Sequence, residues 1–152
     1  MKDVIRIGSG AAWWGDRVEP AALNAEKGQL DYLCFETMAE ATVSAAQVRA
    51  RRDPSFPGYD TYLDDRMKAV LPACIKNGTK IITNQGWINP DAAAKRIVYW
   101  LKEFGFNGVK VASVNGSLIT EHVLELTDLI LENGQPTSSL KSNLISAEVY
   151  QG

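Results

Sequence analysis

The sequence predicts an α/β fold: a three-layer domain with a mainly parallel, Rossmann-like sheet of about five strands and helices on both faces. Short apolar segments alternate with longer segments of helical periodicity along the whole chain. Residues 31–36 are apolar and aromatic on both faces, as is typical of a buried parallel strand. At 152 residues the chain is most simply a single domain.

The first half of the chain contains two predicted strands and two predicted helices. Pro20 suits the first turn of a helix and Gly28 its end, while Asp53-Pro54 ends the second helix. Alanine and valine recur at helical spacing before that point. The expected elements are a strand at 4–8, a helix at 19–27, a strand at 31–36 and a helix at 37–52.

The second half continues the alternation. Pro72 should kink or split the helix that contains it, because proline lacks an N–H group and clashes with the preceding turn. Asn89 and Pro90 form a helix start with a side-chain cap. The expected elements are a helix at 61–76, a strand at 80–83, a helix at 90–104, a strand at 109–114, a helix at 120–131 and a strand at 143–149.

The last predicted strand has few residues after it. A parallel strand needs cover on both faces, so we expect other helices of this chain, or a companion chain, to supply that cover. Without it the sheet would keep an edge that invites association. A homo-oligomer or a complex with a second chain is therefore expected.

Composition excludes several classes of function. The net charge of −2 gives no electrostatic reason to expect nucleic acid. No apolar run approaches the roughly 18 residues that span a bilayer, so no membrane is expected. The first residues show no signal-peptide pattern, which predicts a cytoplasmic protein. Cys34 and Cys74 stand far apart in apolar surroundings and are expected to be reduced, buried thiols.

The segment after the first strand is the first candidate site, because ligands of α/β proteins bind at the carboxyl ends of parallel strands. It departs from the dinucleotide fingerprint, since Trp13 stands in place of the third glycine, and a nicotinamide site is kept only as an alternative. A phosphate or carboxylate at the next helix N-terminus is better supported. Two packed core tryptophans are the structural alternative. The candidate ligand-binding residues here are Gly8, Ser9, Gly10, Trp13, Trp14 and Asp16.

Polar residues follow the other strands too. Glu36 and Glu40 would lie one helical turn apart and could do acid/base work, or could be solvated acids at a helix start. Asn84 could act catalytically by polarising a carbonyl. Further candidate ligand-binding residues, each also compatible with an ordinary turn or strand end, are Gln85, Gly86, Asn115 and Glu148. We expect these segments to converge at one edge of the sheet.

Other chemistries lack their sequence patterns. The chain has no P-loop and no nucleophile-elbow pattern, and its one histidine, His122, follows a predicted helix cap. Cysteine and histidine are not clustered, so no metal site is predicted. Glu36, Glu40 and Glu148 could hold a hard cation, but no spacing rule supports it.

Several of these segments, in this order, resemble the acyclic terpene utilisation AtuA family. They are Ile5-Arg6-Ile7-Gly8-Ser9-Gly10-Ala11-Ala12-Trp13-Trp14-Gly15-Asp16, Leu30-Asp31-Tyr32-Leu33-Cys34-Phe35-Glu36 with Ala39-Glu40, Val70-Leu71-Pro72-Ala73-Cys74, Thr83-Asn84-Gln85-Gly86 with Asn89-Pro90, and Leu144-Ile145-Ser146-Ala147-Glu148-Val149-Tyr150-Gln151-Gly152. The resemblance spans essentially the whole chain and corresponds to the first part of the N-terminal domain of longer family members. It implies a role in the catabolism of branched acyl compounds through coenzyme A thioesters.

The sequence therefore leads us to expect an enzyme, or part of one, that acts on an acyl-CoA or a related carboxylate by lyase- or hydratase-like chemistry. Glu36 or Glu40 would move the proton, and Asn84 and Gln85 would polarise a carbonyl. No cofactor is predicted with certainty, and a coenzyme A thioester is the expected substrate. A noncatalytic subunit or binding module, completed by a partner chain, is the alternative.

Overall fold

A computed structural model describes residues 3–126, 130–140 and 143–149. Within these residues the fold is α/β and contains one small parallel sheet in the order β1-β2-β3. The strands are β1 (Ile7–Ala11), β2 (Tyr32–Phe35) and β3 (Lys80–Thr83). The α/β class predicted from the alternation of apolar segments is confirmed.

Five α-helices and one short 3₁₀-helix lie within the described residues. The helices are α1 (Glu19–Lys27), α2 (Glu40–Arg52), α3 (Leu63–Asn77), α4 (Pro90–Glu103) and α5 (Thr120–Glu125), and the 3₁₀-helix is η1 (Thr137–Ser139). The predicted helix start at Asn89 is confirmed, because its side chain accepts a hydrogen bond from the N–H of Ala92.

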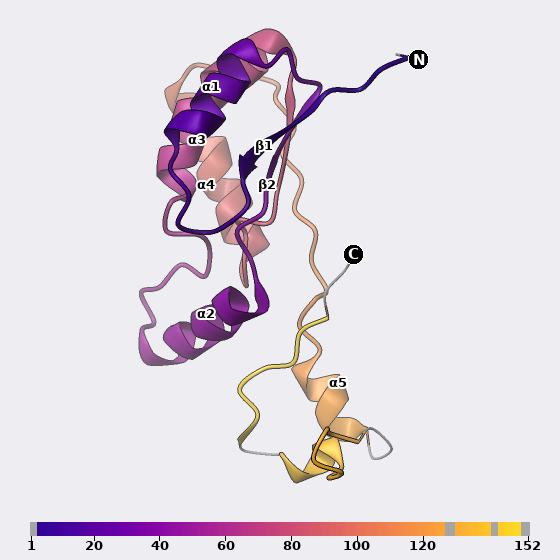
Figure 1. Cartoon of the computed structure of the whole chain (residues 1–152). Helices are drawn as coiled ribbons and strands as arrows, with labels where there is room; N and C mark the ends of the chain where they lie inside the picture. Colours follow the sequence, from indigo (N-terminus) through magenta and orange to yellow (C-terminus); the bar gives the residue numbers. More distant parts are fainter. Residues whose placement is uncertain (1–2, 127–129, 141–142, 150–152) are drawn as a thin grey trace.

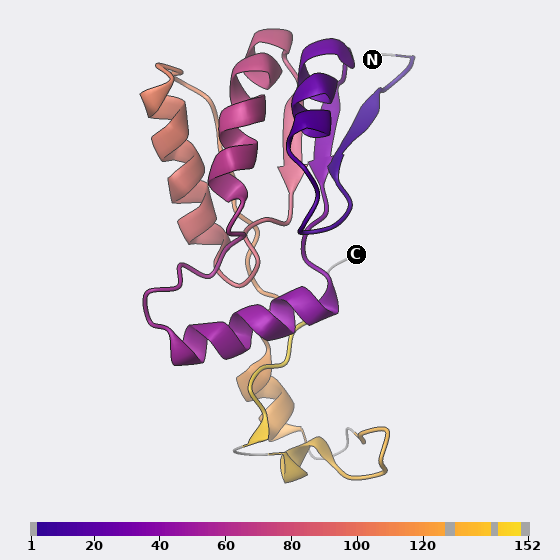
Figure 2. The ribbon, with the colours of Figure 1, turned by 60° about the vertical axis from the view of Figure 1, so that its left-hand side comes forward.

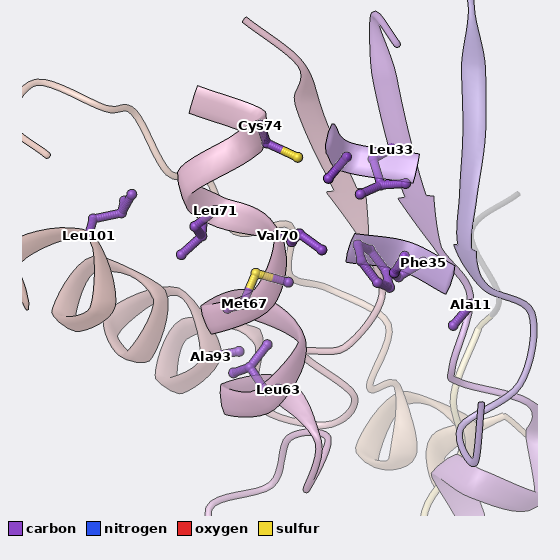
Figure 3. Close-up of a cluster of buried hydrophobic side chains, with 12 residues drawn as sticks. Ala11, Leu33, Phe35, Leu63, Met67, Val70, Leu71, Cys74, Ala93 and Leu101 are labelled. Atoms are coloured by element: carbon purple, nitrogen blue, oxygen red, sulfur yellow. The ribbon is translucent and has the colours of Figure 1, made fainter. Parts of the chain in front are cut away.

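The core lies between the sheet and one layer of helices. Helices α1 and α3 pack against the strands, and α4 packs against α3 on the side away from α1, so that the three helices lie side by side (Figures 1 and 2). Leu33 and Phe35 point from β2 toward Met67 and Val70 on α3, as Figure 3 shows. All four of these side chains are buried, so the helices bury this face of the sheet in one continuous apolar cluster.

The opposite face of the sheet is bare. Ile7 is 67% exposed and Ile82 is 57% exposed, although both side chains are large and apolar. No helix within the described residues covers this face (Figure 1). The expectation of helices on both faces is therefore wrong for the part of the chain that the structure describes. The connection between two neighbouring parallel strands is nearly always right-handed. Because each new strand here adds on the same side of the previous one, in the order β1-β2-β3, the connecting helices that pack on the sheet all lie on the same face.

The prediction of five strands is also wrong. Residues 109–114 form no strand and pair with no neighbouring strand, and Val111 packs against the core instead. Asp91, at the start of α4, holds the end of this segment by accepting hydrogen bonds from Ser113 and Asn115. The predicted strand at 143–149 forms only an isolated antiparallel bridge between Glu148 and Leu118. Residues 109–114 have a high β propensity, but they form no strand because side-chain contacts, and not a backbone ladder, hold them in place.

Several predicted boundaries also need correction. Strand β1 begins at Ile7 rather than residue 4. Helix α2 begins at Glu40 rather than Thr37, because the backbone before it is extended at Ala39 (ψ 165°). Helix α3 contains Pro72 without being split into two helices. The last helix ends at Glu125, well before residue 131.

Helix α2 lies crosswise beyond the carboxyl ends of the strands (Figure 2). Gln47 donates a hydrogen bond of 2.5 Å to Glu148, and Arg51 donates one of 2.7 Å to the carbonyl oxygen of Ile145. These hydrogen bonds attach the described residues 143–149 to α2 and not to the sheet. None of the helices in the described residues is long and apolar enough to cross a membrane.

Candidate site at the carboxyl edge of the sheet

An open pocket of about 610 Å³ lies at the carboxyl edge of the sheet and extends onto its bare face. We call it the edge pocket. All three strands contribute to it, and apolar side chains form most of its floor. Its lining residues are Ile7, Gly8, Ser9, Ala11, Ala12, Cys34, Phe35, Glu36, Ile82, Thr83 and Asn84. Of the predicted site residues, the structure brings together Gly8, Ser9, Glu36 and Asn84.

The polar part of the edge pocket is a hydrogen-bonded pair. Asn84 Nδ2 donates to Glu36 Oε1 at 2.9 Å, and the same oxygen accepts the backbone N–H of Met38 at 2.9 Å. Asn84 Oδ1 accepts the backbone N–H of Thr37 at 2.8 Å. These contacts join the ends of β2 and β3, so a carboxylate and an amide have fixed positions next to one another.

The glycines of the first candidate segment lie inside β1 rather than in a turn. A Cβ atom at Gly10 would meet the ring of Phe35 at 2.4 Å, so the missing side chain makes room for the core. The turn itself starts at Ala12, where the Asp16 carboxylate accepts the backbone N–H groups of Ala12 and Trp13 at 2.8 and 3.0 Å. This carboxylate therefore occupies two backbone amides of the turn, whereas the anionic ligand was expected at the N-terminus of the next helix, which begins at Glu19.

The two tryptophans lie outside the edge pocket. Trp13 is 60% exposed and meets Trp14 edge-on, with ring centroids 6.2 Å apart. Trp14 packs against Tyr62 with centroids 5.5 Å apart. Neither tryptophan belongs to the core cluster, and neither lines the pocket.

Sequence reasoning missed a buried polar network behind this edge. Asp60 and Arg66 form an ion pair at 2.5 Å, and both side chains are fully buried. Gln85 Nε2 donates to the same Asp60 oxygen at 2.9 Å. The buried Gln85 side chain therefore does not reach the pocket. Arg66 lies on the apolar face of α3, and a cation at such a position is the signal that could have indicated a buried partner.

The remaining predicted residues lie elsewhere. Glu40 is the exposed first residue of α2, so it does not stand one helical turn after Glu36 as predicted. A Cβ atom at Gly86 would lie 2.7 Å from Pro90 Cα, so this glycine permits close packing onto α4. Asn115 donates to Asp91, and Glu148 accepts from Gln47. None of these four residues lines the edge pocket.

Two acidic groups, Asp91 on α4 and Asp64 on α3, are stabilised in their charged form. The hydroxyl of Ser113, followed by the amide of Asn115, lowers the pKa of Asp91. The guanidinium of Arg96 holds the pKa of Asp64 below its usual range. The structure groups no three metal-ligating side chains within its described ranges.

Comparison with known proteins places the chain in context. A family model described as "Acyclic terpene utilisation family protein AtuA" matches residues 5–152. No curated protein matches the chain, and no solved structure matches it. The family match covers every strand and helix described above and includes all residues of the edge pocket.

Proposed function

Because this chain belongs to the acyclic terpene utilisation AtuA family, we propose that it is an enzyme, or a subunit of one, that acts on an acyl-CoA or a related carboxylate. The proposed reaction class is lyase- or hydratase-like acid/base chemistry. One observation carries the proposal: a carboxylate and an amide are held together at the carboxyl edge of a parallel sheet, beside an open apolar floor.

Glu36 is the proposed acid/base group. In the hydration of an enoyl thioester, its carboxylate would accept a proton from water as the water oxygen bonds to the β-carbon. The displaced electron pair would move to the thioester oxygen. The protonated Glu36 would then give its proton to the α-carbon of the resulting enolate, which restores the carboxylate and completes the addition of water. The hydrogen bonds from Met38 N and Asn84 Nδ2 orient the carboxylate but use only one of its oxygens.

Asn84 is the proposed carbonyl-polarising group. An amide nitrogen carries two hydrogens, so Asn84 Nδ2 can donate one to Glu36 and the other to the thioester oxygen. Such a donor stabilises the charge that develops on an enolate oxygen. Gln85, which was expected to share this role, is engaged with Asp60 and is left out of the mechanism.

The floor of the edge pocket suits an apolar acyl chain. Ile7, Cys34 and Ile82 come from three adjacent strands and line the pocket on the bare face. Gly8 and Ser9 contribute backbone between them. Apolar lining with a few fixed polar groups is the usual composition of a small-molecule site. A coenzyme A thioester in the cytoplasm remains the proposed substrate and setting.

Two matched variants test the proposal. Glu36→Gln should lower the rate of hydration of a short branched enoyl-CoA by about 100-fold or more, because the general base is lost. Glu40→Gln makes the same chemical change on an exposed residue outside the pocket and should retain the rate. Full activity of Glu36→Gln, assayed in the complete assembly, would exclude the proposed role.

A noncatalytic subunit completed by a partner chain is the second candidate. The bare apolar face of the sheet favours it, because parallel sheets are normally covered on both faces. Size measurement of the chain alone, and after co-expression with neighbouring gene products, separates the two candidates. A stable monomer that binds an acyl-CoA would argue against the partner, whereas a homo-oligomer or a mixed complex without CoA binding would favour it.

A further inference from the structure

One buried side chain connects the loops behind the edge pocket. The Nη2 atom of Arg66 donates to the carbonyl oxygens of Trp14 and Asp16 at 2.6 and 3.2 Å. Its Nη1 atom donates to Asp60 Oδ2 at 2.5 Å. A single guanidinium on α3 therefore holds both the β1–α1 loop and the loop that precedes α3.

Asp60 extends the connection to a third loop. Its Oδ2 atom also accepts a hydrogen bond from Gln85 Nε2 at 2.9 Å, and its backbone N–H donates to the Gln85 carbonyl oxygen at 2.9 Å. Its other carboxylate oxygen accepts the N–H of Tyr62 at 2.8 Å. The β3–α4 loop is thus joined to Asp60 through both side chain and backbone.

These loops carry opposite walls of the edge pocket. Ala12, in the β1–α1 loop, lines one side, and Asn84, the residue before Gln85, lines the other. Asn84 in turn holds Glu36 by its hydrogen bond. The distance between the walls therefore depends on a network that does not itself line the pocket.

We infer that Arg66 is a positioning residue for the edge pocket: with Asp60 and Gln85 it fixes the loop at Ala12 relative to Asn84. Lysine cannot replace it, because one ammonium group lacks the planar fork that reaches a carboxylate and two carbonyls on separate loops. What the pocket binds rests on the proposed function, but the positioning of the loops does not.

The tryptophans provide a direct readout, because the indole N–H groups of three of them report on different places. Trp14 donates to Thr61, Trp87 in the β3–α4 loop donates to Thr37, and Trp100 on α4 donates to Asp64. ¹⁵N–¹H spectra of the full chain can follow each indole separately. Trp14 and Trp87 lie in loops that the network joins, whereas Trp100 does not.

Arg66→Lys is the test variant and Arg96→Lys the matched control. Arg96 also donates to a carboxylate on α3, that of Asp64, but it lies outside the network. Arg66→Lys should shift the Trp14 and Trp87 resonances while Trp100 stays in place, and should weaken binding of isovaleryl-CoA at least tenfold. Arg96→Lys should shift Trp100 alone and leave binding unchanged.

A second variant serves if Arg66→Lys does not fold. The side-chain oxygen of Gln85, Oε1, has no hydrogen-bond partner in the described part of the chain. Gln85→Met therefore removes the hydrogen bond from Nε2 to Asp60 and leaves the ion pair between Asp60 and Arg66 in place. It should shift Trp87 and weaken binding while Trp14 stays in place.

Three outcomes are decisive. A folded Arg66→Lys or Gln85→Met protein with unshifted loop indoles and unchanged binding would overturn the inference. Lower thermal stability, with equal perturbation of all indoles and unchanged binding, would show a purely structural role and overturn it as well. If the unaltered chain does not bind isovaleryl-CoA, the proposed function fails, and the indole shifts alone decide whether Arg66 positions the loops.

Discussion

The two cysteines have surroundings that predict opposite reactivity. Cys74 lies on α3 in the core, where burial raises the pKa of its thiol to about 11. Cys34 is half-buried and lines the edge pocket from the other face of the sheet. Since the thiolate is the reactive species, iodoacetamide at pH 8 should modify Cys34 in the folded chain and Cys74 only after unfolding. Peptide mass spectrometry measures both sites.

The same labelling tests the pocket. Saturating isovaleryl-CoA should slow alkylation of Cys34 without affecting Cys74 in denaturant, because only Cys34 lies at the proposed acyl-binding floor. The Cys34→Ser chain provides the background. Equal rates of Cys34 alkylation with and without the thioester would mean that the ligand does not cover this part of the pocket.

Single residues also show which parts of the site the sequence could indicate. Asn84 and Glu36 were identified because polar residues at strand ends are typical of ligand sites, and these two line the pocket. Asp16 and Gln85 follow the same pattern, yet each is used within the protein, by backbone amides and by Asp60. Sequence spacing predicts the loop on which a side chain lies, but it does not predict the group with which that side chain forms its hydrogen bonds.

At the scale of elements, the residue types that mark the ends of helices gave correct predictions. Gly28 follows α1 directly, and Asn89 caps α4, because these signals act within one helical turn. Residues 109–114 failed as a strand because a parallel ladder needs a neighbour in register, which local propensity cannot supply. The start of α2 was placed too early for a related reason: Glu36 and Thr37 form hydrogen bonds with the side chain of Asn84, which follows β3 and is far away in the sequence.

The attachment of residues 113–115 to α4 should depend on pH. Hydrogen bonds from Ser113 and Asn115 lower the pKa of Asp91, so the folded chain favours the charged carboxylate. A lowered pKa stabilises the folded arrangement above the usual carboxyl pKa near 4, and this contribution is lost as the pH falls through the lowered value. Limited proteolysis with pepsin at stepwise decreasing pH should therefore cleave 109–115 increasingly early.

The Asp91→Asn chain is the control for this dependence. Asparagine keeps an oxygen acceptor for Ser113 but has no charge to lose, so its cleavage within 109–115 should respond less to pH than that of the unaltered chain. Identical pH profiles for the two chains would show that another group controls the attachment.

At the scale of the whole molecule, the arrangement of layers follows from the strand order. Each strand adds next to the previous one in the order β1-β2-β3, so right-handed crossovers place α1 and α3 on one face. The alternation of elements predicted the α/β class correctly. It could not predict the layers, because the position of a later strand relative to the first decides whether helices reach the second face.

The bare face gives the last prediction. Ile82→Lys places a charge on this face at the outer strand β3, on a side chain that is already 57% exposed. The free energy of unfolding of the isolated chain should change by less than about 1 kcal/mol. If a second chain or copy covers this face, burying the lysine there would cost several kcal/mol and the complex should dissociate.

Leu23→Lys on α1, 52% exposed on the opposite side, is the matched control and should leave assembly intact. Light scattering of the co-expressed proteins measures the outcome, and an assembly that tolerates Ile82→Lys as well as Leu23→Lys would show that the bare face is not its interface.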